Sequence, residues 1–166
     1  SRGLGDVYKI QHNIGFGIWI EPEMINTRSE LYEKHPDWVL KASERDVVLG
    51  RGGTQVVLDL ANPAVQDFVF GVVDNLMTSY PEIDYIKWDA NMSVQNHGSQ
   101  YLTKDNQSHM YIEFHRGFEK ICQRIRAKYP DLTIQACASG GGRANYGVLP
   151  YFDEFWVCLL YTSDAA

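Results

Sequence analysis

Five short apolar runs alternate with longer segments of helical periodicity along the chain. Each run is rich in β-branched and aromatic residues and is bounded by turn residues, as is typical of β-strands. The predicted strands are Gly15–Ile20, Gln55–Leu60, Ile83–Asp89, Leu132–Cys137 and Asp153–Val157. Because Gly15–Ile20 is apolar at nearly every position, we expect it to be buried on both faces, as in a parallel sheet.

Two segments repeat apolar residues at spacings of three and four, which predicts amphipathic helices. The first follows the helix-starting pair Asn62-Pro63, and its apolar positions are Val65, Phe68, Val69, Val72, Val73, Leu76 and Tyr80. The second spans Ser108–Lys128, and its apolar stripe is Tyr111, Phe114, Phe118, Ile121, Cys122 and Ile125. A shorter helix is predicted at Ser29–Lys34, with Ser29 as its N-cap.

Strands that alternate with helices indicate βαβ units and a parallel sheet. Polar residues follow the predicted strands, at Glu21, Asp59, Asp89 and Ser139, and the carboxyl ends of the strands carry the site in a (β/α)8 barrel. A complete barrel takes about 250 residues. We therefore predict an α/β fold that is part of a (β/α)8 TIM barrel, with about five parallel strands and intervening helices. A doubly wound sheet is the alternative, although no GxGxxG or Walker motif supports it.

Composition narrows the class of protein. The 166 residues are 45% hydrophobic and 22% charged, with a formal net charge of -6, which is typical of a soluble globular protein. The acidic balance argues against binding to nucleic acid or to an anionic membrane. Three cysteines without a CxxC pair do not favour a disulfide framework, and no apolar run is long enough to cross a membrane.

The end of the strand at Ile83–Asp89 carries a candidate site. Lys87, Asp89 and Asn91 occupy alternate positions, so they project to the same side if the strand continues that far. A cation, a carboxylate and an amide side by side suit a polar substrate. The alternative is a strand end with a buried, paired aspartate.

Trp19, Glu21 and Glu23 share one parity in the same way, so an aromatic ring and two carboxylates could face one cleft. The alternative is a tryptophan in the core, with glutamates that are solvated or paired with arginines. Arg51 lies in a glycine-rich loop, where it is either a solvated surface residue or a substrate clamp. A phosphate cradle at residues 139–143 also stays open.

Neither a metal nor a cofactor is expected. His109 and His115 are six residues apart on the predicted helix, a spacing that does not bring two imidazoles onto one face.

Four separated motifs together resemble the α-galactosidases of glycoside hydrolase family 36. They are Trp19–Met24, Val57–Leu60, Lys87–Asn91 and Cys137–Arg143, and the similarity, which includes Tyr32, His35–Trp38 and Tyr85-Ile86, extends from Gly15 to Val157.

The resemblance implies a retaining glycoside hydrolase that releases terminal α-linked galactose from oligosaccharides by double displacement, without a cofactor. It implies that Asp89 is the nucleophile and that Lys87 and Asn91 bind galactose hydroxyls. Trp19 would line the sugar subsite, Arg51 would contact the substrate, and Cys137 and Gly140 would shape the pocket. A galactosyl transferase of the raffinose-synthase type, a non-catalytic carbohydrate-binding relative and an unrelated barrel enzyme stay as alternatives.

The resemblance also locates the missing acid/base. The family places it in an S-D-x-x-D motif directly after the tryptophan of the last strand, whereas Ser163-Asp164 follows five residues late. Five residues of strand displace a carboxylate by about 16 Å and reverse its face. We therefore expect the acid to be absent, with Asp164 a poorly placed candidate, and residues 158–166 to be a non-native tail. Residues 1–166 are then an inactive fragment of a single catalytic barrel domain, and homo-oligomerisation of the full-length protein is left open.

Overall fold

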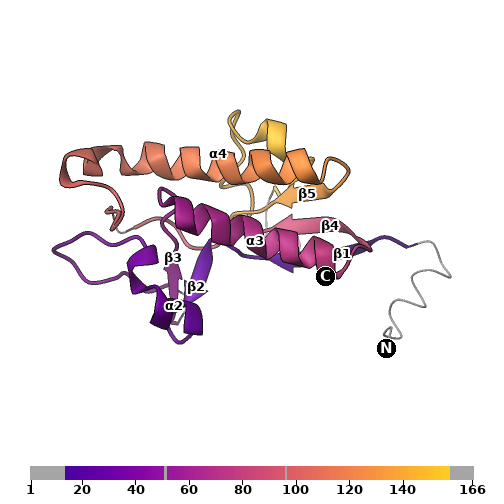
Figure 1. The fold of residues 1–166 in the computed structure, drawn as a ribbon. Helices are drawn as coiled ribbons and strands as arrows, with labels where there is room; N and C mark the ends of the chain where they lie inside the picture. The colour runs from indigo at the N-terminus through magenta and orange to yellow at the C-terminus, as the bar shows by residue number, and fades with distance from the viewer. Residues whose placement is uncertain (1–13, 51, 96, 158–166) are drawn as a thin grey trace, which may run out of the picture.

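The computed structural model describes residues 14–50, 52–95 and 97–157, and its centre is a parallel sheet of four strands (Figure 1). The strands are β1 (Phe16–Ile20), β4 (Ile83–Trp88), β5 (Thr133–Ala136) and β6 (Glu154–Phe155), and they are hydrogen-bonded in that order. Each neighbouring pair is parallel. The predicted α/β class with a parallel sheet is therefore confirmed.

Helices make the crossovers between the parallel strands. The long helices α3 (Pro63–Ser79) and α4 (Met110–Lys128) precede β4 and β5, and the 3-10 turn η3 (Leu149–Tyr151) precedes β6. Figure 1 shows α3 and α4 side by side over one face of the sheet. Successive βαβ units of one hand cover a single face in this way, so the opposite face of the four strands is free to carry polar side chains.

One predicted strand does not belong to this sheet. The segment predicted at 55–60 forms β3 (Gln55–Val57), which pairs antiparallel with β2 (Met24–Asn26), a strand that the sequence pattern did not predict. The expectation of about five parallel strands was wrong: the described residues contain four. Val56 and Val57 of β3 are buried. The chain that leaves the 3-10 turn η1 (Pro36–Trp38) pairs with the end of β3, where Leu40 N donates to Val57 O at 2.9 Å and Asp59 N to Trp38 O at 2.7 Å.

The expectation that the first strand is buried on both faces was also wrong. Within β1 only Ile20 is buried, whereas the side chains of Phe16 and Trp19 are 44% and 48% exposed. Trp19 pairs with Lys87 in the β1–β4 register, so it lies on the face of the sheet that the long helices do not cover, and β1 is also an edge strand.

The helices follow their predicted caps closely. Asn62 Oδ1 accepts from Ala64 N at 3.0 Å at the start of α3, and Ser29 Oγ accepts from Tyr32 N at 3.2 Å before the short helix α2 (Glu30–Lys34). The 3-10 turn η2 (Lys104–His109) occupies the first two predicted residues of α4. The predicted stripe of α4 is correct except that Tyr111 is exposed and Met110 is buried instead.

The helix α4 packs closely on the chain segment between β3 and α3. A Cβ atom at Gly117 of α4 would lie 1.8 Å from Leu60 O, so a side chain cannot be accommodated there without moving backbone.

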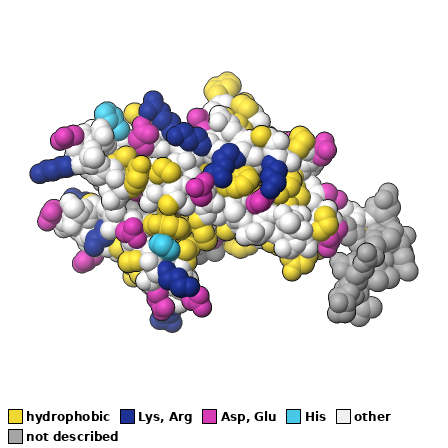
Figure 2. All heavy atoms as spheres, in the orientation of Figure 1, with side chains coloured by type: hydrophobic (Ala, Val, Ile, Leu, Met, Phe, Trp, Pro, Cys, Tyr) yellow, Lys and Arg dark blue, Asp and Glu magenta, His cyan; other side chains and the backbone are white. Residues whose placement is uncertain are grey.

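Figure 2, in the orientation of Figure 1, shows charges of both signs interspersed over the surface of the helices. Arg124 pairs with Asp67 at 2.7 Å and Lys128 with Asp74 between the helices, and surface ion pairs of this kind contribute little to stability.

Among the described residues, none of the helices combines the length and the apolar character needed to span a bilayer. Cys122 and Cys137 are buried free thiols.

Candidate active site

The two faces of the sheet differ in chemistry. Ile86 and Trp88 of β4 are fully buried on the helix side, where Trp88 packs edge-on against Phe118 at 6.0 Å between ring centroids. Residues of the other parity, Tyr85 and Lys87, are half-buried on the opposite face. There Tyr85 Oη and Gln135 Nε2 both donate to Glu154 Oε2, at 2.8 and 3.0 Å. The uncovered face is therefore polar along three strands.

Asp89 follows β4 directly and is fixed by both neighbouring strands. Its backbone N donates to Ile20 O of β1 at 2.9 Å, and Cys137 N donates to Trp88 O at 2.8 Å. The carboxylate is only 5% exposed. Its Oδ2 accepts from the indole N–H of Trp19 at 3.0 Å, and its Oδ1 accepts from Ala90 N at 2.9 Å. A carboxylate at a rigid strand end is thus held by directed donors on both oxygens.

These donors keep Asp89 ionised. Burial acts to raise its pKa, but hydrogen bonds from the side chains of Trp19, Asn91 and Cys137 and from the Ala90 N–H outweigh that effect and hold the pKa below its usual value. The sequence suggested attraction by the Lys87 ammonium as the cause. The structure assigns the leading role to the hydrogen bonds instead.

The other residues of this strand end lie around the carboxylate. Lys87 Nζ stacks over the ring of Trp156 at 3.8 Å, and Trp19 is its partner in the β1–β4 register. Asn91 Oδ1 accepts from Ser139 Oγ at 3.1 Å. Although β4 ends at Trp88, so that strand parity does not extend to Asn91, the side chains of Asp89 and Asn91 are hydrogen-bonded to one another.

Cys137 and Gly140 border the same group from the end of β5. The thiol of Cys137 is 1% exposed, and its pKa is raised by burial and by its hydrogen bond to Asp89. Gly140 is buried with a φ of 98°, a conformation that suits glycine, and its carbonyl accepts from Ala138 N at 2.9 Å. Ser139 has a positive φ of 51° in the same turn.

Glu23 does not face a cleft with Trp19, so the prediction was wrong for this residue. The chain turns at Pro22, and parity along a strand no longer applies beyond the turn. Glu21 Oε1 accepts from Asn91 N at 2.8 Å, and its Oε2 accepts from Gln55 Nε2 at 2.9 Å. Glu23 is fully buried on the helix side of the sheet, where it is paired with an arginine, as the alternative interpretation held.

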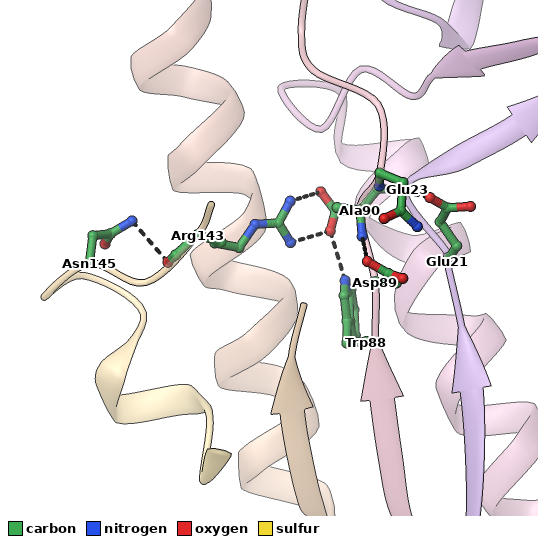
Figure 3. Close-up of polar contacts among 8 residues, drawn as sticks. Glu21, Glu23, Trp88, Asp89, Ala90, Arg143 and Asn145 are labelled. Carbon is green, nitrogen blue, oxygen red and sulfur yellow. Dashed lines mark hydrogen bonds and ion pairs between the residues drawn. The ribbon is translucent and has the colours of Figure 1, made fainter. Parts of the chain in front are cut away.

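Arg143 is the partner of Glu23, and sequence reasoning missed this role. Figure 3 shows both its terminal nitrogens on the Glu23 carboxylate, with the indole N–H of Trp88 on the same group. The distances are 2.5 and 2.9 Å from Arg143 and 2.7 Å from Trp88 Nε1. The signal in the sequence was a single arginine after a glycine run, which gives no indication of a partner 120 positions away.

Three further candidate residues of the sequence analysis are Asp59, Arg51 and Asp164, and of these the structure describes only Asp59. Asp59 follows β3 but bonds to Ser99 Oγ at 2.5 Å and Ala61 N at 3.1 Å, and burial raises its pKa. It therefore joins the loop after β4 to the start of α3. Arg51 and Asp164 lie outside the described residues, as does the tail 158–166.

The bond between Trp19 and Asp89 predicts a change in pH dependence. Trp19→Phe keeps an aromatic ring but removes a donor that stabilises the carboxylate, so the pKa of Asp89 should rise. In the full-length protein that carries this segment, the titration of the Asp89 carboxyl, followed by carbon NMR, should move to higher pH. Trp38→Phe, whose ring stacks on His35, should leave this titration in place. An unshifted titration in Trp19→Phe would show that the Trp19 bond does not tune the Asp89 carboxyl.

Comparison with known proteins identifies the family. Residues 2–165 match the melibiase family. Alpha-galactosidase 2 of Pediococcus pentosaceus is 40% identical over 146 residues, which are 88% of this chain and 20% of that protein. Alpha-galactosidase AgaA of Geobacillus stearothermophilus is 35% identical over 157 residues, or 93% of this chain and 21% of that protein. The chain therefore spans about a fifth of the length of these relatives.

Solved structures give the same result. The α-galactosidase of Lactobacillus brevis superposes with a TM-score of 0.85 at 36% identity, over 92% of this chain and 20% of that one. A variant of the family 36 enzyme AgaA in complex with raffinose superposes with a TM-score of 0.85 at 32% identity, over 93% of this chain and 21% of that one. With a match over nearly its whole length and a four-stranded sheet that fits part of their catalytic domain, the chain belongs to the melibiase family, the α-galactosidases of glycoside hydrolase family 36.

Proposed function

We propose that the full-length protein that carries this segment is a retaining α-galactosidase in which Asp89 is the nucleophile. This full-length protein is called the complete enzyme below. The observation that carries this proposal is the Asp89 carboxylate, which is fixed at a strand end by donors on both oxygens and whose pKa is held low. A nucleophilic carboxylate has to be ionised and immobile at the pH of the reaction. Support for the substrate class comes from variants of AgaA that were solved in complex with raffinose and with stachyose.

The proposed reaction proceeds in two displacements. In the first, an oxygen of Asp89 forms a bond to the anomeric carbon while the glycosidic C–O bond breaks, and a second carboxylic acid protonates the leaving oxygen. In the second, water attacks the anomeric carbon, the bond to Asp89 breaks, and the same second group accepts the proton of water. Two inversions give a product with the α configuration of the substrate.

Stereochemistry tests the proposal directly. Proton NMR of an aryl α-galactoside hydrolysed by the complete enzyme should show α-galactose first, before mutarotation adds the β anomer. If β-galactose forms first, the reaction inverts, and Asp89 is not a covalent nucleophile. If galactose appears chiefly on an added sugar acceptor, the transferase alternative holds.

Lys87 and Asn91 are proposed to bind sugar hydroxyls beside Asp89. A lost hydrogen bond costs about 0.5–1.5 kcal/mol, and about 1.5–3 kcal/mol when a charge takes part. Lys87→Ala should therefore weaken binding of a galactose-type inhibitor more than Asn91→Ala does, as measured by isothermal titration. Lys120→Ala on α4 is the matched control and should bind normally. Unchanged affinity in both site variants would remove the two residues from the sugar site.

A further inference from the structure

Two carboxylates on the turn after β1 hold the residues on either side of Asp89. Glu21 accepts the backbone N–H of Asn91 at 2.8 Å, and Glu23 accepts the indole N–H of Trp88 at 2.7 Å. We infer that Glu21 and Glu23 are positioning residues, which fix the Asp89 carboxylate for attack without touching the substrate. The inference rests on the proposed role of Asp89 as nucleophile.

The Glu23 side of this arrangement is fully desolvated. Glu23 has no exposed surface and Trp88 has 1%, so the bond between them is shielded from water. Arg143 neutralises the carboxylate with two bonds and also packs over the ring of Phe118, 4.4 Å from its centroid. Burial alone would lower the pKa of Arg143, but the charge of Glu23 raises it. The charged pair therefore fixes the orientation of the Trp88 indole, and with it the backbone that leads into Asp89.

Glu21 supplies the acceptor for a backbone N–H that no neighbouring strand bonds. Beyond Trp88 and Asp89 the chain leaves the sheet, and the amide of Asn91 is bonded to a side chain instead of a neighbouring strand. The second oxygen of Glu21 accepts from Gln55 of β3 at 2.9 Å. Because both oxygens of Glu21 are bonded in this way, the carboxylate restrains the backbone at Asn91. The side chain of Asn91 in turn bonds to Asp89.

The small antiparallel sheet anchors both glutamates. Strand β2 begins at Met24, directly after Glu23, and pairs with β3. Leu58 N donates to Glu23 O at 2.9 Å, so the turn itself is bonded to the end of β3. This gives a function to the strand that the sequence pattern did not predict: it holds the turn whose carboxylates locate the nucleophile.

Positioning of this kind has a large effect on rate. Attack on the anomeric carbon needs reacting atoms about 3–3.5 Å apart and aligned, and an error of about 1 Å can cost roughly 100-fold. Loss of the Glu21 acceptor leaves Asp89 its sheet bonds but frees residue 91. We expect Glu21→Ala to lower kcat at saturating substrate by about 10- to 100-fold, and Glu21→Gln, which keeps a carbonyl acceptor, to recover part of that loss.

An external nucleophile tests whether Glu21 acts by positioning Asp89, because such a nucleophile reacts without Asp89. In Asp89→Ala, azide can attack the anomeric carbon of a p-nitrophenyl α-galactoside: a C–N bond forms, the C–O bond to p-nitrophenolate breaks, and β-galactosyl azide results. Azide does not depend on where Asp89 is held. Glu21→Ala should therefore lower the azide-dependent rate by less than about 3-fold in the Asp89→Ala background, although it lowers kcat about 10- to 100-fold when Asp89 is present.

Three further conditions control the comparison. Rates are measured at saturating substrate, so that any weaker sugar binding by Asn91 in Glu21→Ala raises KM and leaves kcat unchanged. Glu30→Gln on α2, a solvated glutamate that pairs with Lys34, should change neither rate. Glu23→Gln, which keeps a carbonyl for Trp88, repeats the comparison for the other arm.

Equal losses in both backgrounds, or no loss in either, would overturn the positioning role. Near-normal turnover by Asp89→Ala would instead overturn the proposed function, so the two failures are distinguishable.

Discussion

Asp89→Ala is expected to reduce turnover of an aryl α-galactoside in the complete enzyme by several orders of magnitude. In the proposed mechanism the substitution removes the oxygen that would form the covalent intermediate, and Trp19 and Ala90 then have no carboxylate to bond. Added azide or formate should partly restore the rate, because each supplies a nucleophile of small size where the side chain was. The measurement is kcat with and without the anion.

Asp67→Ala on the outer face of α3 is the matched control, since its side chain is 72% exposed. It should retain normal turnover and show no response to azide. Normal turnover in Asp89→Ala would remove this residue from the role of nucleophile, whatever its contacts.

Arg143→Met is expected to have the largest effect on stability. It leaves the Glu23 carboxylate fully buried without its ion-pair partner, and removal of one member of a buried pair costs about 3–5 kcal/mol. The urea midpoint and the thermal unfolding temperature of the complete enzyme should both fall. Arg116→Met, which breaks an exposed pair with Glu113 on α4, should change them little.

The double variant Glu23→Leu/Arg143→Met gives a sharper comparison. Replacement of both charges by apolar side chains often restores the stability lost on breaking a buried pair, so unfolding should return toward the wild-type midpoint. Turnover of the double variant should be low, because Glu23→Leu removes the acceptor of the Trp88 indole N–H. Recovery of both quantities together would show that the pair contributes stability alone.

Much of the fold follows from patterns that are local in the sequence. The spacing of apolar residues in α3 and α4 and the caps Asn62 and Ser29 are properties of nearby residues. The structure confirms both helices and both caps, although Tyr80 and Tyr111 of the predicted stripes are exposed. Alternation predicted that Asp89 and Asn91 share a side if the strand continued that far. The strand β4 ends at Trp88, and the two residues meet beyond it through a hydrogen bond. The four motifs in their order predicted the family, which the match over residues 2–165 shows.

The tertiary structure decided which segments meet. An apolar run of the sequence predicts burial but does not name the strand that it pairs with, so β3 was assigned to the parallel sheet although it pairs with β2. Trp19 is likewise half-exposed in spite of its apolar neighbours, because it lies with Lys87 on the face of the sheet that the long helices do not cover.

The electrostatics of the site depended on contacts that no local pattern records. Trp19 and Asp89 are 70 positions apart, and Glu23 and Arg143 are 120 apart. The sequence by itself determined that a carboxylate would stand at the end of β4. The tertiary structure decided which donors keep this carboxylate ionised and which glutamate is buried against an arginine. These contacts form only when the parallel strands bring their carboxyl ends to one edge of the sheet, because hydrogen bonds act over a few ångströms irrespective of separation along the chain.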